Sequence, residues 1–330
     1  MPNFLYGDTV RFFYRALFFF LLLFLTISFV NADGRYSISA PQEYRLRYLV
    51  EVENTGGPAR DLKLQIPIFM IDGLPPYQKL ISSRLPDGVR IIRDNDGQIA
   101  VYHQARFEKG RSLSLEFSFT FVNYAIDYQL NPYRGKSSVE PRYLQPEPGI
   151  ESDAAAVIDL ARKLTVSCGT QLEKARKLFY YVNQTLEYRR IEQDSYSALR
   201  TLQIGKGVCE DFSLAYIALC RASEIPARIV RGYRFNLSDL RFGETDLKTM
   251  AHAWVEVNLP AEGWVTVEPT FDYRINGIKT VNYDFFGKID QSDRHLFFSY
   301  IRDNAPNYSW THDPRNPANL KLSFRTLLRK

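Results

Sequence analysis

The chain has 330 residues, of which 45% are hydrophobic and 24% charged, values that exclude a disordered or fibrous protein. The formal net charge of +5 is small for this length, and no run of five or six like charges occurs, so no nucleic-acid-binding surface is predicted. The length allows two domains.

The N-terminus has the pattern of a secretory signal. Arg11 and Arg15 precede an apolar run over 16–30, which ends at Val30-Asn31-Ala32. Residues 1–32 are therefore predicted to be a signal peptide, with an uncleaved membrane anchor as the alternative. In both cases the remaining chain is exported to a periplasmic or extracellular location. Any membrane association would run through 16–30.

The next part of the chain is dominated by period-two alternation of apolar and polar residues, which is typical of half-buried strands. Strands are predicted within 36–53, 61–70, 89–93, 98–103 and 112–122. No long helical pattern interrupts them, so residues 33–130 are predicted to form an all-β sandwich. Residues 131–149, rich in proline, are predicted to be a linker.

From residue 150 the pattern becomes helical. The segment 152–164 is predicted as a helix with Ser152 as N-cap, and a second helix follows Thr170, whose capping box includes Glu173. A shorter helix covers 195–204, another begins at about Cys209, and strands follow at 227–235, 251–259 and 263–272. The predicted fold class is α+β, with the sandwich followed by an α+β domain over 150–330.

Cys209 is the candidate nucleophile among three cysteines, an odd number that leaves at least one thiol unpaired in an exported monomer. Gly205 and Gly207 allow a sharp turn before the helix that starts at Cys209. A helix N-terminus favours thiolate over thiol, and the Cys209 backbone N–H is a candidate oxyanion donor. Cys220 falls on the buried helix face and is predicted to be a core residue. Cys168 is predicted to be structural, and a disulfide between these two remains open.

His252 is the candidate base, because it opens a strand that a short loop connects to the strand carrying Glu268. If Leu259 pairs with Val265 in this hairpin, Glu268 and His252 face the same side and Asp272 lies nearly opposite His252. A shift by one residue would turn Glu268 away, so Glu268 and Asp272 are alternative third members. No motif surrounds the other histidines, which are His103, His295 and His312.

Four segments in this order resemble the transglutaminase-like superfamily, whose core is papain-like: GVCEDF, RASEIPARIVRGY, AHAWVEV and GWVTVEPT. The sandwich resembles that of exported bacterial members. The resemblance implies a catalytic triad of Cys209, His252 and a third residue that is normally aspartate. Here that residue is Glu268, one methylene longer, which must be placed differently to reach imidazole Nδ1. Trp254 and Trp264 are predicted to pack, and Arg228 and Arg231 to face solvent.

The predicted activity is thiol-dependent acyl chemistry on a peptide or protein amide, through a thioester on Cys209. The enzyme would be a peptidase, an amidase or a transglutaminase. A catalytically impaired peptide-binding module and a structural envelope protein are the alternatives. No cofactor is expected, and the histidines are too scattered along the sequence to predict a zinc site.

Overall fold

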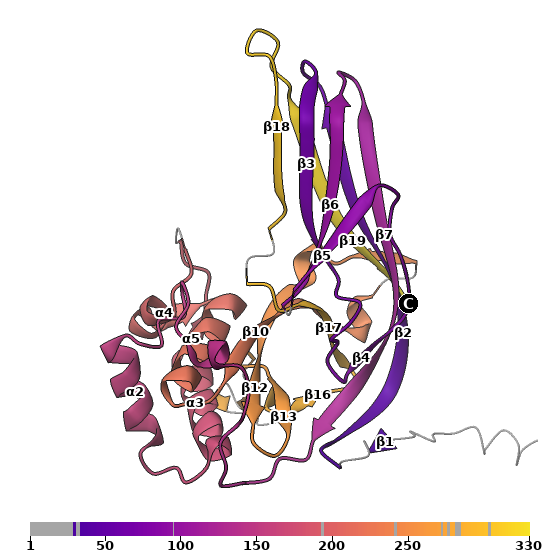
Figure 1. Ribbon diagram of the computed structural model, residues 1–330. Helices are drawn as coiled ribbons and strands as arrows, with labels where there is room; N and C mark the ends of the chain where they lie inside the picture. The colour runs from indigo at the N-terminus through magenta and orange to yellow at the C-terminus, as the bar shows by residue number, and fades with distance from the viewer. Residues whose placement is uncertain are drawn as a thin grey trace, which may run out of the picture.

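The computed structural model describes residues 29–30, 34–94, 96–192, 195–240, 243–271, 273–275, 278–280, 285–302 and 305–330 (Figure 1). Most of the predicted signal over 1–32 lies outside the described residues. Among the helices that are described, none is long and apolar enough to cross a membrane. The predicted α+β class with an N-terminal β-sandwich is confirmed.

The sandwich consists of two antiparallel sheets. One has the order β11-β19-β2-β7-β16, with β1 paired to β2 and β4 paired to β7; the other has the order β18-β3-β6-β5. Alternate apolar residues of the long strands β2 and β7 fill the space between the sheets. The strands of the first sheet are β1 (Phe29–Val30), β2 (Tyr36–Asn54), β4 (Gln78–Arg84), β7 (Ser112–Tyr128), β11 (Glu244–Asp246), β16 (Lys288–Ile289) and β19 (Leu320–Arg329). Those of the second are β3 (Ala59–Ile68), β5 (Val89–Arg93), β6 (Gln98–Phe107) and β18 (Asn307–Thr311).

The end of the chain returns to the sandwich. Strand β19 pairs with β2 over its whole length, and β18 pairs with β3. These residues were predicted to belong to the α+β domain over 150–330, and instead they complete the sandwich. Alternation predicts a strand but does not reveal which sheet the strand joins.

The second unit has a four-stranded antiparallel sheet in the order β13-β12-β10-β17, covered on one side by helices (Figure 1). Its strands are β10 (Ala227–Asn236), β12 (Ala251–Leu259), β13 (Gly263–Val267) and β17 (Asp293–Ser299). The helices are α2 (Ala155–Thr165), α3 (Gln171–Thr185), α4 (Ala198–Ile204) and α5 (Cys209–Ala222). Short elements complete it: β8 (Glu187–Tyr188), β9 (Lys206–Gly207), β14 (Tyr273–Ile275), β15 (Ile278–Thr280), η1 (Pro141–Leu144), η2 (Leu237–Asp239) and η3 (Lys248–Met250).

Two predicted helix starts have different outcomes. Thr170 caps α3, and its capping box with Glu173 is confirmed. Ser152 is not the cap of α2, because the helix begins later and Ala154 occupies the N-cap position without a side-chain hydrogen bond.

The sandwich covers the other side of this four-stranded sheet, so β17 is buried on both faces. Phe297 packs in the core beneath the helices, whereas its neighbours Leu296 and Phe298 pack in the sandwich core. Two buried amide side chains of the sandwich also hold the β17 backbone. Gln78 exchanges hydrogen bonds with the Phe297 backbone, and Asn123 donates to the carbonyl of His295 at 2.9 Å. The sandwich thereby fixes the position of β17.

Candidate active site

Cys209 is the first residue of α5, as the sequence predicts. Gly205 ends α4 in the left-handed region at φ 72°, which glycine adopts without strain. Gly207 passes so close to Asp211 that a Cβ at this position would lie 2.3 Å from the Asp211 Cβ. The Asp211 carboxylate in turn accepts a hydrogen bond from the Val208 N–H at 2.8 Å and fixes the start of the helix. The two glycines therefore set the point at which the thiol enters the site.

His252 lies on β12, the strand that packs directly against α5. The Ser213 hydroxyl bonds to the carbonyls of Cys209 at 2.8 Å and of Ala253 at 3.3 Å, and so ties the helix to this strand. The Cys209 side chain lies close enough to the His252 imidazole to contribute to raising its pKa. Since Nε2 of the imidazole is bound to Glu268, Nδ1 is the nitrogen left for the thiol.

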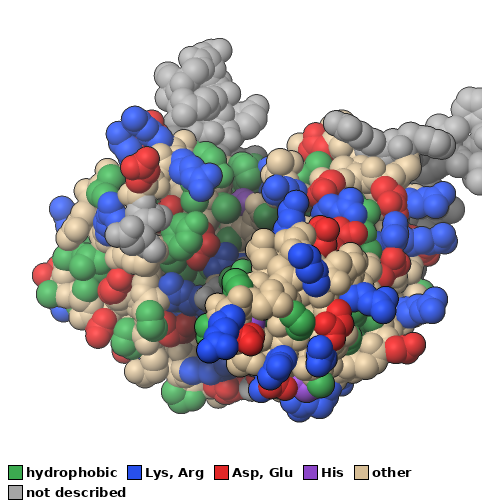
Figure 2. Space-filling view, turned by 90° about the horizontal axis from the view of Figure 1, so that it is seen from above, with side chains coloured by type: hydrophobic (Ala, Val, Ile, Leu, Met, Phe, Trp, Pro, Cys, Tyr) green, Lys and Arg blue, Asp and Glu red, His purple; other side chains and the backbone are tan. Residues whose placement is uncertain are grey.

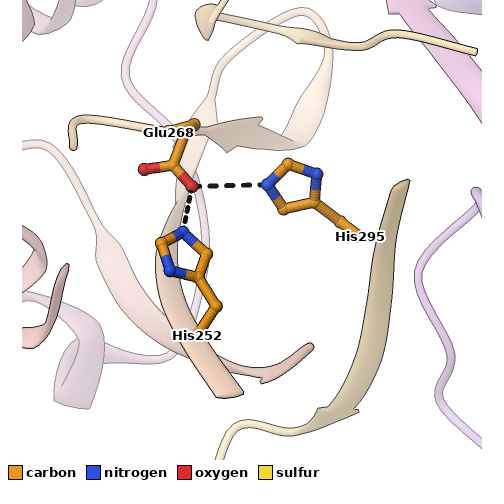
Figure 3. A group of neighbouring side chains, drawn as sticks. All are labelled: His252, Glu268 and His295. Atoms are coloured by element: carbon orange, nitrogen blue, oxygen red, sulfur yellow. Dashed lines mark hydrogen bonds and ion pairs between the residues drawn. The ribbon is translucent and has the colours of Figure 1, made fainter. Parts of the chain in front are cut away.

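Glu268 is the carboxylate that reaches this imidazole. Its Oε2 lies 2.5 Å from His252 Nε2, and its Oε1 accepts the Thr270 backbone N–H at 2.9 Å (Figure 3). The predicted contact at Nδ1 is wrong, because the glutamate binds the other ring nitrogen. Asp272, the alternative third residue, lies outside the described residues.

The hairpin register explains why Glu268 still faces His252. Leu259 pairs with Gly263 and Val257 with Val265, so the predicted pairing of Leu259 with Val265 is wrong by two residues. Because side chains alternate with a period of two, an even shift keeps every residue on the predicted face. Glu268 follows the last residue of β13 and is directed toward His252.

The site carries a strongly coupled buried pair. The His252 and Glu268 side chains are 8% and 4% exposed. Burial disfavours both ions, but their mutual attraction outweighs it: the pKa of Glu268 is held well below its usual range, and the pKa of His252 is raised to about 10 with a further contribution from Cys209. The arrangement favours an imidazolium that lies between a carboxylate and the thiol.

His295 joins this group from β17, although the sequence offers no motif around it. Its Nε2 lies 3.3 Å from Glu268 Oε2 (Figure 3). Its ring packs edge-on against Trp254, with ring centroids 5.0 Å apart. Ligand atoms of His252, Glu268 and His295 all lie within 4.8 Å of one another, a spacing that an ion could bridge. Two histidines far apart in sequence are thus neighbours in space. Glu268 hydrogen bonds with both histidines, so we interpret the cluster as a hydrogen-bonded group centred on the carboxylate.

Tyr188 is a second site residue that the sequence analysis missed. It lies on β8, its side chain is exposed, and its phenol lies near Cys209. Burial and the nearby Cys209 side chain raise the pKa of Tyr188, so the phenol remains protonated near neutral pH. No sequence signal separates this tyrosine from the other 20 in the chain.

The surface next to the site is hollowed. A hollow of about 490 Å³ lies beside Cys209 and His252, and it shares Tyr196 with a second hollow of about 520 Å³. Val208 and Ala251, the neighbours of Cys209 and His252, belong to the lining of the first. Figure 2 shows a depression between the helical part and the sandwich, with a histidine side chain visible inside it.

The other two cysteines have no part in the site. Cys220 is fully buried, and burial raises the pKa of its thiol well above the usual range. This agrees with its prediction as a core residue. Cys168 is half-buried, and all three cysteines are free, so the disulfide left open by the sequence is not formed.

The prediction that Arg228 and Arg231 face solvent is wrong. Arg228 binds Glu256 at 2.7 Å and lies over the rings of Tyr300 and Trp264. Arg231 makes two hydrogen bonds to Glu210, the residue next to Cys209. Both faces of strand β10 are covered, so the alternating arginines are buried in ion pairs.

Comparison with known proteins agrees with this geometry. Residues 158–269 match the model of the transglutaminase-like superfamily. This part of the chain is therefore similar to transglutaminase-like domains. A crystal structure from Cytophaga hutchinsonii, presented as a putative cysteine protease, has the same fold with a TM-score of 0.53, 17% identity, and coverage of 88% of this chain and 99% of that chain.

Two curated relatives cover shorter stretches. The uncharacterized protein YebA of Bacillus subtilis is 32% identical over 174 residues, which are 45% of this chain and 23% of that protein. A protein-glutamine gamma-glutamyltransferase of Pseudomonas aeruginosa is 37% identical over 70 residues, 20% of this chain and 10% of the relative. The chain thus spans between 10% and 27% of the length of the curated relatives that it matches.

Proposed function

We propose that the protein is a cysteine enzyme that forms a thioester between Cys209 and the acyl group of a peptide or protein carboxamide. The observation that carries the proposal is the hydrogen bond between His252 and Glu268, with Cys209 near the imidazole at the start of a helix beside a surface hollow. A nucleophile, a base and a group that orients the base are the minimum set for this chemistry.

The reaction proceeds in two halves. The Cys209 sulfur attacks the carbonyl carbon, and the electron pair of the C=O bond moves to oxygen. His252 then gives its Nδ1 proton to the departing nitrogen as the C–N bond breaks, which leaves the thioester and neutral imidazole. In the second half, His252 takes a proton from water or from an amine that attacks the thioester, and the sulfur leaves as thiolate. The names of two similar proteins, a putative cysteine protease and a protein-glutamine gamma-glutamyltransferase, are both consistent with this intermediate.

The developing oxyanion has two donors within reach. The Cys209 N–H points out of the first turn of α5, where it has no partner within the helix. The Tyr188 hydroxyl lies near the Cys209 backbone. A substrate oxygen placed between the two groups would receive the N–H and could accept the phenol hydrogen as well.

Glu268 supports activity in place of the usual aspartate. Its extra methylene spans the distance from the end of β13 to His252 Nε2, where the contact measures 2.5 Å. We further propose that the protein works outside the cytosol, in the periplasm or extracellular space, because residues 1–32 have the composition of a secretory signal.

Alkylation of Cys209 by iodoacetamide tests the proposal without a known substrate. Rapid labelling near neutral pH, lost in His252→Ala, is expected, because the imidazole supports the thiolate. The buried Cys220 is an internal control in the same sample. Labelling at the rate of an ordinary free thiol, unchanged in His252→Ala, would instead support a peptide-binding module or a structural envelope protein.

A further inference from the structure

His295 shares a carboxylate oxygen with the catalytic histidine. Both rings approach Glu268 Oε2, His252 at 2.5 Å and His295 at 3.3 Å, and the His295 and Glu268 side chains are only 5% and 4% exposed (Figure 3). A carboxylate oxygen can accept two hydrogen bonds, so the two rings do not compete. The buried carboxylate therefore has three donors, which are two imidazoles and the Thr270 N–H.

The longer side chain of Glu268 requires an additional contact to hold its carboxylate in one conformation. Glutamate has one more rotatable side-chain bond than aspartate and loses more conformational freedom when it is held in one geometry. Thr270 holds Oε1. His252 binds Oε2, but it is also the group that must exchange protons with the substrate. A donor from another strand, outside the reacting atoms, would hold Oε2 in place while His252 changes its charge.

His295 is built as a rigid donor. Trp254, fully buried, packs edge-on against its ring and lies parallel to the His252 ring. Asn123 of the sandwich holds its backbone carbonyl. A carboxylate only accepts, so the ring must carry its hydrogen on Nε2. Nδ1 is buried with no partner among the described residues, which suits an unprotonated nitrogen.

We propose that His295 is a positioning residue that holds Glu268 in the rotamer required by His252, and that it compensates for the glutamate at a position where the superfamily usually has aspartate. The proposal rests on the thioester function proposed above. The group becomes a series of four side chains, Cys209–His252–Glu268–His295, contributed by α5, β12, the end of β13 and β17.

Other titratable groups lie near this series and bear on its pH dependence. Tyr188 from β8 interacts electrostatically with both Cys209 and Glu268. Arg234 from β10 pairs with Asp293 of β17 at 2.6 Å and lies over the Phe271 ring, which contacts His252 on its other side. Because the charges of Arg234 and Asp293 are opposite, their combined electrostatic effect on the series is small. The pH dependence of the series is therefore set mainly by its own four side chains.

Two amide substitutions of His295 separate positioning from simple packing. The terminal nitrogen of glutamine occupies about the place of imidazole Nε2, and that of asparagine about the place of Nδ1. His295→Gln can donate to Glu268, whereas His295→Asn cannot reach it. The readout is the rate of Cys209 alkylation by iodoacetamide across acidic and alkaline pH, measured by mass spectrometry on the full chain, with circular dichroism as the check on folding.

The expected result is a wild-type profile for His295→Gln. In His295→Asn, the acid side of the profile should move upward by about one pH unit, or about ten-fold in rate on that side, as expected for one long hydrogen bond to a charged group. In a Glu268→Asp background, where the shorter carboxylate cannot contact both rings, His295→Asn should have little further effect.

The outcomes distinguish this proposal from the function on which it rests. If wild-type Cys209 labels slowly and is insensitive to His252→Ala, the proposed function fails. If wild-type Cys209 is reactive but both His295 variants keep its profile, or both move it equally, His295 only packs and the positioning role is refuted.

Discussion

Replacing Glu268 by glutamine removes the charge that holds His252 as a cation while keeping nearly the same shape. The closest atoms of the pair lie 2.5 Å apart in a buried site. With an effective dielectric of about 20 the attraction is roughly 6–7 kcal/mol before desolvation is subtracted. Removal of one partner from such a pair costs about 3–5 kcal/mol. The pKa of His252 should therefore return toward its ordinary value.

The assay is Cys209 alkylation near neutral pH, where the wild-type imidazolium supports the thiolate. With about 1.4 kcal/mol per pH unit, the loss corresponds to a decrease of at least about a hundred-fold in labelling rate. His252→Ala is the matched control and should lose a similar factor. If the labelling rate of Glu268→Gln stays within about three-fold of wild type, the charge of Glu268 does not affect the reactivity of the Cys209 thiol, and the proposed role of the carboxylate is wrong.

The same variant predicts a pH dependence of stability. The pKa of His252 is raised from 6.5 to about 10, so its contribution is complete below pH 6.5 and is lost as the pH rises toward 10. The pKa of Glu268 is lowered from 4.5, so its contribution is complete above pH 4.5 and is lost at lower pH. The difference in free energy of unfolding between wild type and Glu268→Gln should be greatest between pH 4.5 and 6.5. If this difference in free energy of unfolding increased above pH 6.5, the inferred rise in the pKa of His252 would be contradicted.

Three further substitutions test separate parts of the account. Tyr188→Phe should lower the rate of acylation by p-nitrophenyl acetate by about ten- to a hundred-fold. Iodoacetamide labelling should be unchanged, because alkylation forms no oxyanion. Faster acylation would show that the phenol only blocks the Cys209 N–H. Arg228→Ala should lower the free energy of unfolding in urea by about 3–5 kcal/mol, because the Glu256 side chain, 2% exposed, loses its partner. A loss below about 1 kcal/mol would contradict a buried pair. Cys220→Ala should leave the labelling of Cys209 within about two-fold of wild type, and a larger effect would give Cys220 a role beyond packing.

Local patterns predicted the parts of the structure that depend on local interactions. The alternation over 112–122 and the helix start at Cys209 are confirmed because each follows from backbone geometry and side-chain period. Glu268 and His252 lie on the same face as predicted, although the predicted register was wrong, because the register shift was an even number of residues. Gly205 has the left-handed backbone and Gly207 the close approach that a sharp turn before a helix requires.

The remaining features depend on pairing between distant parts of the chain. His295 reaches Glu268 only because β17 lies beside β10, three strands away from β13 in the sheet, and no local pattern encodes that order. Strand β19 joins β2 across most of the chain length. Arg228 was misassigned because an alternating strand with both faces covered looks the same in sequence as one with a solvated face.

The most direct test of thioester formation on Cys209 is the mass of the intact protein after brief exposure to p-nitrophenyl acetate. We expect one added acetyl group in the wild type, located on Cys209, released by hydroxylamine at neutral pH, and absent from Cys209→Ala. An adduct that persists in Cys209→Ala, or no adduct in a folded wild-type protein, would show that Cys209 does not form the thioester.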